Sequence, residues 1–223
     1  MKNMLNLLWQ KKFLILVLAL LIALLPIAMT KEPVVLSRAL LTSIGIEKDG
    51  DTYTIHAEHF IFNFDPFGVM EREIVSGEGK SVQEALTNLG TRLGKSTSLT
   101  HCTIIILGKG LESHNMLELL RPLLLKPQLD NDCMLFYTQS DIEPLMQTSI
   151  ETGDARSGRI HVIAQFNQRQ QMHSSVTLEK FFRQSLAGNQ TVRMPRVNLQ
   201  DDQIENDGTY ATFLGGKLLH VPE

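Results

Sequence analysis

The stretch Val75-Ser-Gly-Glu-Gly-Lys-Ser-Val-Gln-Glu-Ala-Leu86 joins the end of a β-like segment to the start of a helix-like one. Gly77 and Gly79 relax the backbone where the strand ends. Ser81 is followed three residues later by Glu84, which is the spacing of a capping box at a helix N-terminus. The stretch therefore predicts a helix that begins after Ser81 and packs its apolar side on a sheet. The residues expected to face the core are Val82, Ala85 and Leu86.

The same stretch contains Gly79-Lys80-Ser81, which matches the last three residues of a phosphate-binding loop with the pattern G-x-x-x-x-G-K-[ST]. That loop needs a glycine five residues before Gly79, and Ile74 stands at this position. Gly77 is too close to Gly79 to leave a loop that could enclose a phosphate. The spacing favours a strand end and a helix cap over a nucleotide site, so no nucleotide partner is expected.

An antiparallel hairpin is predicted ahead of this stretch. Val34 to Glu47 and Thr52 to Phe64 are rich in β-branched and aromatic residues, and they flank Lys48 to Asp51, whose Asp-Gly pair is a strong turn signal. Val69 to Glu78 is a third extended segment.

Strands and helices are then predicted to alternate. The expected order is a helix ending at Gly94, a strand over 103–107, a helix over 111–125, a strand over 132–138 and a helix over 141–148. In the second of these helices, one side would carry Met116, Leu117, Leu120 and Leu124. This alternation predicts an α+β (mixed α/β) fold, in which a mixed sheet carries packed helices.

The C-terminal third begins with polar segments, 151–158 and 167–175, which indicate loops or a boundary. Thr177 is expected to cap a helix that ends at Gly188, and residues 194–198 and 209–214 look extended. Residues 208–221 read as a hairpin that turns at Gly215-Gly216, and it would join the main sheet, bind a partner or begin another domain. We therefore expect a mixed α/β domain over 31–165, followed at 166–223 by a helix and terminal hairpin that begin a truncated second domain.

The N-terminus predicts export. Phe13 to Met29 is an unbroken apolar run that follows Lys2, Lys11 and Lys12. Because no good cleavage site follows it, residues 1–30 are expected to be an uncleaved signal anchor, a transmembrane helix, rather than a removed signal peptide. The lysines on the leading side place the rest of the chain outside the cytoplasm, anchored to the membrane.

The charge balance excludes one class of partner. Residues 1–30 hold three lysines and no acidic residue, so the exported part has 18 basic and 24 acidic side chains and a net charge of about −6. Such a surface has no attraction for nucleic acid, and no nucleic-acid partner is expected.

Candidate chemical groups do not assemble into a site in the sequence. His56 and His59 would point to opposite faces of a strand, and the adjacent His101 and Cys102 would also point apart. Asp201-Asp202 reads as a solvated turn, and Arg193 with Arg196 reads as a loop edge. No catalytic, cofactor-binding or metal-binding residues are predicted, and the partner-binding residues are unknown. Cys102 and Cys133 precede two strands, and pairing and free burial are both open for them.

Several segments, in order, resemble the N-terminal region of the spore-germination GerAC-like proteins, the C subunits of germinant receptors in endospore-forming Firmicutes. They are Ser43-Ile-Gly-Ile-Glu-Lys-Asp-Gly-Asp-Thr-Tyr-Thr-Ile55, Ser76-Gly-Glu-Gly-Lys-Ser-Val-Gln-Glu-Ala85, Leu99-Thr-His-Cys-Thr-Ile-Ile-Ile-Leu-Gly108, Val176-Thr-Leu-Glu-Lys-Phe-Phe182 with Pro195-Arg196, and Gly208-Thr-Tyr-Ala-Thr-Phe-Leu-Gly-Gly-Lys-Leu-Leu219.

The resemblance implies a non-enzymatic subunit of a germinant-receptor-like complex that takes part in spore germination. The subunit would be anchored to the cell membrane or the spore inner membrane, and it would need no cofactor. Its implied partners are the membrane and multi-spanning receptor subunits of the A and B types. The sequence departs from the family in lacking the usual lipid-bearing cysteine and a complete C-terminal domain. The alternatives are an envelope-anchored enzyme or small-ligand-binding protein, or a degenerate truncated copy.

Overall fold

The computed structural model describes residues 38–62, 70–126, 129–130, 132–152, 158–169, 175–206 and 208–222. The predicted anchor over residues 1–30 lies outside this part of the chain. Within it, no helix is both long and apolar enough to cross a membrane. Residues from Ala39 to Glu223 cluster as one compact unit, and a domain boundary at residue 165 stays a prediction.

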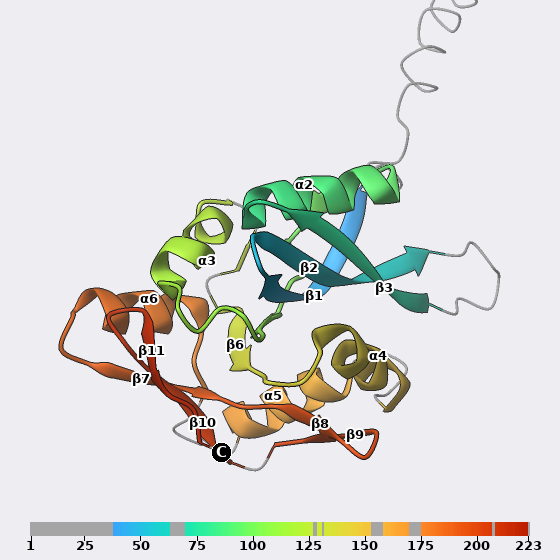
Figure 1. The fold of residues 1–223 in the computed structure, drawn as a ribbon. Helices are drawn as coiled ribbons and strands as arrows, with labels where there is room; N and C mark the ends of the chain where they lie inside the picture. The colour runs from blue at the N-terminus through green and yellow to red at the C-terminus, as the bar shows by residue number, and fades with distance from the viewer. Residues whose placement is uncertain are drawn as a thin grey trace, which may run out of the picture. The chain divides into compact units, whose positions relative to one another are not determined.

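A mixed sheet forms the centre of the fold, as predicted. Its strands follow the order β3-β2-β1-β5-β6, and β4 pairs with β1 (Figure 1). The β1–β2 and β2–β3 pairs are antiparallel, whereas β1–β5 and β5–β6 are parallel. The strands are β1 (Arg38–Asp49), β2 (Thr52–Phe62), β3 (Met70–Gly79), β4 (Ser96–Ser98), β5 (Ile104–Leu107) and β6 (Met134–Tyr137).

The Val75–Leu86 stretch forms the strand end and helix start that its residues predict. Helix α2 (Val82–Leu93) begins at Ser81, whose Oγ accepts a hydrogen bond from the Glu84 N–H, and ends at Gly94 in the left-handed conformation with φ 62°. The Glu84 carboxylate accepts from the N–H of Lys80 at 2.8 Å, one residue earlier than in a standard capping box. Both ends of α2 are therefore capped by local residues.

Gly77 lets α2 lie directly on β3. A Cβ at this position would come within 2.5 Å of the Ala85 carbonyl oxygen and 2.6 Å of the Leu89 backbone nitrogen. Gly79 is equally crowded, since a Cβ there would lie 2.5 Å from the Ala85 nitrogen. The glycines of this stretch thus serve close helix–sheet packing rather than a ligand.

Helix α3 (Met116–Leu124) differs from its prediction in start and in face. It begins five residues later than expected, because the Asn115 side chain caps it by accepting from the Leu117 N–H at 2.9 Å. Met116 and Leu120 are buried as predicted, Leu119 and Leu123 are buried with them, and Leu117 and Leu124 pack against the same core partly buried. Pro122 lies within the helix and does not end it.

Two helices cover the other side of the sheet (Figure 1). Helix α4 (Ile142–Thr152) runs four residues beyond its predicted end, and α5 (Arg159–Arg169) was not predicted at all. The prediction of loops over 151–158 and 167–175 is thus wrong in two places. Residues 151–152 belong to α4, and residues 167–169 belong to α5. The N–H of Ile160 donates to Ser149 Oγ at 3.0 Å and ties the two helices together.

The C-terminal segment forms a helix and two small sheets. Thr177 caps α6 (Leu178–Leu186), as predicted. The terminal hairpin pairs with β7 in a separate sheet of order β11-β10-β7 rather than with the main sheet, and a second hairpin, β8–β9, was not predicted. The strands are β7 (Thr191–Pro195), β8 (Asn198–Gln200), β9 (Gln203–Glu205), β10 (Tyr210–Leu214) and β11 (Lys217–His220).

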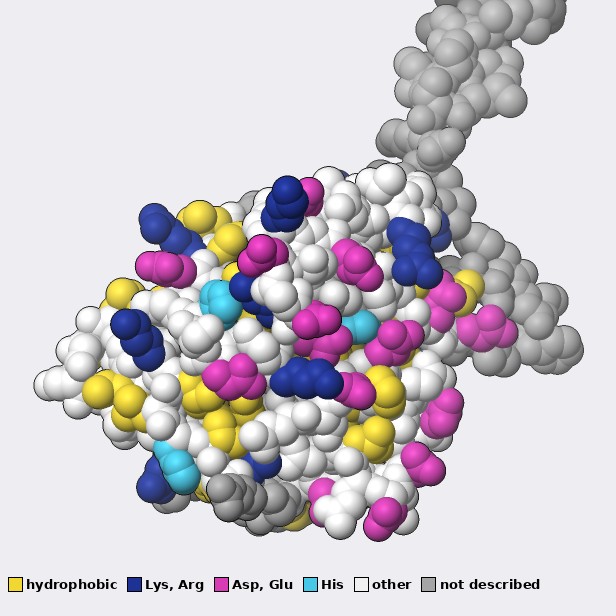
Figure 2. All heavy atoms as spheres, viewed as in Figure 1, with side chains coloured by type: hydrophobic (Ala, Val, Ile, Leu, Met, Phe, Trp, Pro, Cys, Tyr) yellow, Lys and Arg dark blue, Asp and Glu magenta, His cyan; other side chains and the backbone are white. Residues whose placement is uncertain are grey.

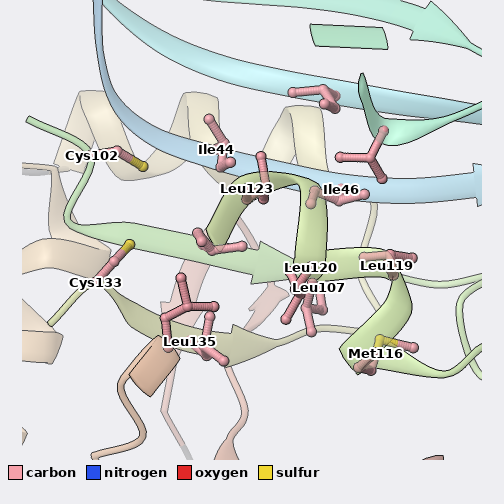
Figure 3. Close-up of a cluster of buried hydrophobic side chains, with 14 of the residues drawn as sticks. Ile44, Ile46, Cys102, Leu107, Met116, Leu119, Leu120, Leu123, Cys133 and Leu135 are labelled. Atoms are coloured by element: carbon pink, nitrogen blue, oxygen red, sulfur yellow. The ribbon is translucent and has the colours of Figure 1, made fainter. Parts of the chain in front are cut away.

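The described residues contain two hydrophobic clusters, one on each side of the main sheet. The larger joins Ile44 and Ile46 of β1 to α2, α3, α6 and the terminal sheet, and Figure 3 shows part of it. The smaller joins β5 and β6 to Ile142, Leu145 and Ile160 of the α4–α5 layer. The two sides of the sheet therefore have separate cores.

Candidate functional site

Strand alternation gives β1, β2 and β3 one aliphatic face and one polar face. Ile55 and Ala57 lie in the larger core with α2, whereas His56 and Glu58 point to the α4 side. The register places Ser43 opposite Glu58 and Ser76 opposite His56 on that same side. A layer of polar side chains therefore lies between this part of the sheet and α4.

Glu58 and Arg72 form the first group in this polar layer. Arg72 Nη1 donates to Glu58 Oε1 at 3.0 Å, and Ser43 Oγ donates to Glu58 Oε2 at 2.7 Å. The side chains of Arg72 and Glu58 are only 6% and 10% exposed. Such burial removes both charges from water, so each depends on the other for its electrostatic stabilisation.

His56 is the centre of the second group. Its Nδ1 lies 2.8 Å from Ser76 Oγ and its Nε2 lies 3.0 Å from Glu47 Oε1, while Glu143 of α4 approaches to 3.8 Å. A serine, a histidine and a carboxylate that contact one another in this order are the components of a hydrolytic triad. The imidazole is only 5% exposed, however, and packs between sheet and helix. We interpret the group as a structural polar network.

A cavity of about 220 Å³ opens beside the Glu58–Arg72 pair. Its polar lining includes Glu58, Arg72 and Thr103, and its apolar lining includes Ile106 and Ile160. Two charged side chains beside an aliphatic wall could hold a small molecule with both polar and apolar parts. This cavity is the best candidate for a ligand site in the described residues.

His101 and His161 meet at this cavity, although they are far apart in sequence. The Nδ1 of His161 lies 3.1 Å from Thr103 Oγ1, and its Nε2 lies 2.8 Å from the Gln165 amide nitrogen. Since the amide can only donate to Nε2, the ring proton would be on Nδ1 and directed to Thr103. His161 is therefore held by Thr103 and Gln165, whereas Cys102, which follows His101 in the sequence, is buried in the larger core.

His59 lies apart from His56, as the strand prediction requires. Its Nδ1 contacts Glu73 Oε1 at 3.2 Å, and burial lowers the pKa of His59 although Glu73 opposes the shift. Among the described residues, no three histidine, cysteine or acidic side chains are grouped so as to hold a metal ion.

The remaining candidates are structural. Asp201 and Asp202 are exposed and form the turn between β8 and β9, with φ of 48° and 57°. The reading of Arg196 as a loop edge was wrong, because its guanidinium is buried and donates to the Pro222 carbonyl at 2.6 Å and to Gln139 Oε1 at 2.8 Å. It ties the last described residues to the loop after β6.

Tyr137 at the end of β6 is a further buried polar group. Its hydroxyl donates to Glu112 Oε1 at 3.3 Å. Burial, with a smaller contribution from the Glu112 charge, raises the pKa of Tyr137 to about 12. The phenol is therefore held in its neutral form.

The sequence offered only a weak signal for the polar layer. Polar residues stand two positions apart in β2, at His56 and Glu58, and in β3 Arg72 and Ser76 share one face with Ile74 between them. This alternation looks like an exposed strand face, and only the cover provided by α4 and α5 makes it buried. Figure 2 shows acidic and basic side chains interspersed on the visible face, rather than gathered by sign.

Comparison with known proteins identifies the family. No curated protein and no solved structure matches the chain significantly. Residues 35–199 match the spore germination protein N-terminal domain. This confirms the GerAC-like resemblance, and the match includes the quoted segments from Ser43 to Arg196, whereas the segment from Gly208 to Leu219 lies outside the matched residues. Because the match covers well over half of the sequence, the chain belongs to the family of spore germination proteins that carry this N-terminal domain.

Proposed function

We propose that this protein is a non-enzymatic subunit of a germinant-receptor-like complex, held at the membrane by its N-terminal segment with the folded part outside the cytoplasm. The family match over residues 35–199 is the observation that carries the proposal. The interior polar groups agree with it, since Glu58 is paired with Arg72 and Ser43, and His56 contacts Glu47 and Ser76. Groups satisfied in this way stabilise a scaffold without performing chemistry.

Association with multi-spanning receptor subunits is tested by purifying a C-terminally tagged full-length chain from sporulating cells in mild detergent. We expect multi-spanning subunits of the A and B types to co-purify with it. The matched control is the same tagged chain with Glu58→Ala and Arg72→Ala, which removes the buried pair and weakens the fold. Recovery of the wild-type chain without any multi-spanning partner would contradict the proposal.

The proposed anchor is tested separately. We expect the chain to resist extraction by high salt and to require detergent, because Phe13 to Met29 would be buried among lipid tails. Release by salt, with an N-terminus near Thr30 or Lys31, would instead demonstrate cleavage of a signal peptide.

A small-ligand-binding function is the second candidate, and the cavity beside Glu58 and Arg72 favours it. Pools of small polar molecules should then raise the melting temperature of the wild-type protein. Thr103→Phe, at the cavity wall, should abolish this shift by filling the space. Thr100→Phe is the matched control, since Thr100 is exposed nearby but does not line the cavity.

An enzymatic version of this second function has a distinct outcome. Turnover of any pool compound should disappear when His101 or His161 is replaced, because these are the histidines that line the cavity and histidine is the commonest general acid or base. Binding without turnover would leave a ligand-binding role, and neither binding nor turnover would exclude this second candidate.

A further inference from the structure

Cys102 and Cys133 lie just before β5 and β6, two neighbouring parallel strands. Cys102 lies two residues before β5 and Cys133 one residue before β6. The register pairs Ile104 with Met134, and the Met134 N–H donates to the Thr103 carbonyl at 2.8 Å. The backbone therefore brings positions 102 and 133 to neighbouring places across the strand pair.

The side chains follow the backbone. Both cysteines are free thiols and are 0% and 1% exposed. Figure 3 shows the two cysteines on neighbouring chain segments, with the side chain of Cys133 directed toward Cys102. The Cys102 thiol donates to the Ile104 carbonyl at 3.4 Å, and the neighbouring Cys102 side chain, together with burial, raises the pKa of Cys133 well above its ordinary value. The two sulfurs are thus neighbours in an apolar setting.

We propose that Cys102 and Cys133 form an intramolecular disulfide that links the starts of β5 and β6. The inference concerns the core of the fold and does not depend on the proposed receptor function. Neighbouring strand positions with converging side chains supply the short Cα–Cα separation that a disulfide needs. Ordinary buried cysteines, by contrast, are separate small apolar side chains.

The oxidant is an external disulfide, either of a small thiol compound or of a thiol–disulfide exchange protein. The thiolate of one cysteine attacks a sulfur of that disulfide, forming a mixed disulfide and releasing one external thiol. The second cysteine loses its proton and attacks the protein sulfur of the mixed disulfide, which releases the second external thiol. The two cysteines are thereby oxidised by two electrons, and the external disulfide is reduced to two thiols.

The timing of this reaction follows from burial. Because the thiolate is the attacking species, the raised pKa of Cys133 and the burial of both thiols among apolar side chains make the pair unreactive in the native fold. Oxidation therefore occurs while the chain folds or during opening of the β5–β6 region, and the finished bond resists reduction for the same reason.

The bond would close a loop of roughly 30 residues that contains β5 and α3. Such a loop restricts the unfolded chain, so the oxidised protein should melt about 5–10 °C above the reduced one. This difference in melting temperature between the oxidised and the reduced protein is the measurable effect of the bond.

The test uses the full-length protein, unfolded and refolded in either reduced or oxidised glutathione. After denaturation and thiol alkylation without reduction, we expect the oxidised sample to carry no alkyl group and to be about 2 Da lighter than unalkylated reduced protein. Before denaturation, the oxidised sample should have the higher melting temperature. A peptide containing residues 102 and 133 joined together should appear after proteolysis. Cys102→Ala and Cys133→Ala are the controls, since either one leaves a single thiol and should remove the difference in melting temperature.

Two results would overturn the inference. One is full alkylation of both cysteines after refolding in oxidised glutathione. The other is their recovery only as glutathione adducts or as disulfides between two chains. Either result would mean that the fold keeps the sulfurs from reaching bonding geometry.

Discussion

Replacing Gly77 with alanine should destabilise this protein, although alanine is ordinarily the better residue in a strand. The new methyl group would lie 2.5 Å from the Ala85 carbonyl oxygen and 2.6 Å from the Leu89 backbone nitrogen. Both atoms belong to the backbone of α2, so no side-chain rotation relieves the clash. The helix must move away from β3 by roughly 1 Å to restore an ordinary contact distance.

The expected magnitude combines two opposing effects. Overpacking a close contact costs about 1–3 kcal/mol, and a rigid backbone neighbour favours the upper end of this range. Replacing glycine in a strand returns about 0.5–1 kcal/mol by restricting the unfolded chain. The free energy of unfolding should therefore fall by about 2 kcal/mol, which corresponds to a melting temperature lower by roughly 4–8 °C for a chain of this size.

Urea unfolding followed by circular dichroism measures this change, with the denaturation midpoint as readout. Glu78→Ala is the matched control, because Glu78 is the next residue of β3, is exposed and points to the opposite face. It should leave the midpoint nearly unchanged. A Gly77→Ala protein as stable as the wild type, or more stable, would refute the claim that this glycine sets the helix–sheet distance.

Three further predictions concern capping, the buried ion pair and an alkaline titration. Ser81→Ala should cost about 1 kcal/mol in urea unfolding, and Ser81→Asp should restore it, because either hydroxyl or carboxylate can accept the Glu84 N–H. Arg72→Ala should cost about 3–5 kcal/mol by stranding the Glu58 carboxylate, whereas replacing both residues with methionine and leucine should recover most of that loss. The pKa of Tyr137 is about 12 in the folded state against about 10 when unfolded, so its neutral phenol contributes stability that is complete below pH 10 and is lost between about pH 10 and 12. Tyrosinate absorbance should show one late-titrating phenol that disappears in Tyr137→Phe, and simultaneous titration of all tyrosines near pH 10 would contradict this.

The parts of the fold that local residues control were predictable. The Asp-Gly turn before Thr52, the caps Ser81 and Thr177, and the turn at Gly215-Gly216 all lie where the sequence indicates. Each of these features depends on backbone conformations or hydrogen bonds within a few residues, so neighbouring sequence contains the necessary information.

The features that depend on distant partners were not predictable. Polar residues in 159–169 masked the helical recurrence of Ile160 and Ala164, which have meaning only once α5 lies against the smaller core. The buried pair of Glu58 and Arg72 depends on the β2–β3 register, which sets Glu58 opposite Ile74 and so places Arg72 diagonally next to it. Alternation predicts that a strand has two faces, but not which polar side chains will meet across strands.

The unequal faces of the main sheet have a consequence for how the protein opens. The α2–α3 side is held by the larger apolar core, whereas part of the α4–α5 side rests on the polar layer around His56 and Glu58. Regions with less apolar burial exchange their amide hydrogens through smaller local openings. The amides of α4 and α5 should therefore exchange sooner than those of α2, so that one cover of the sheet behaves as a separate cooperative unit while the other opens only with global unfolding.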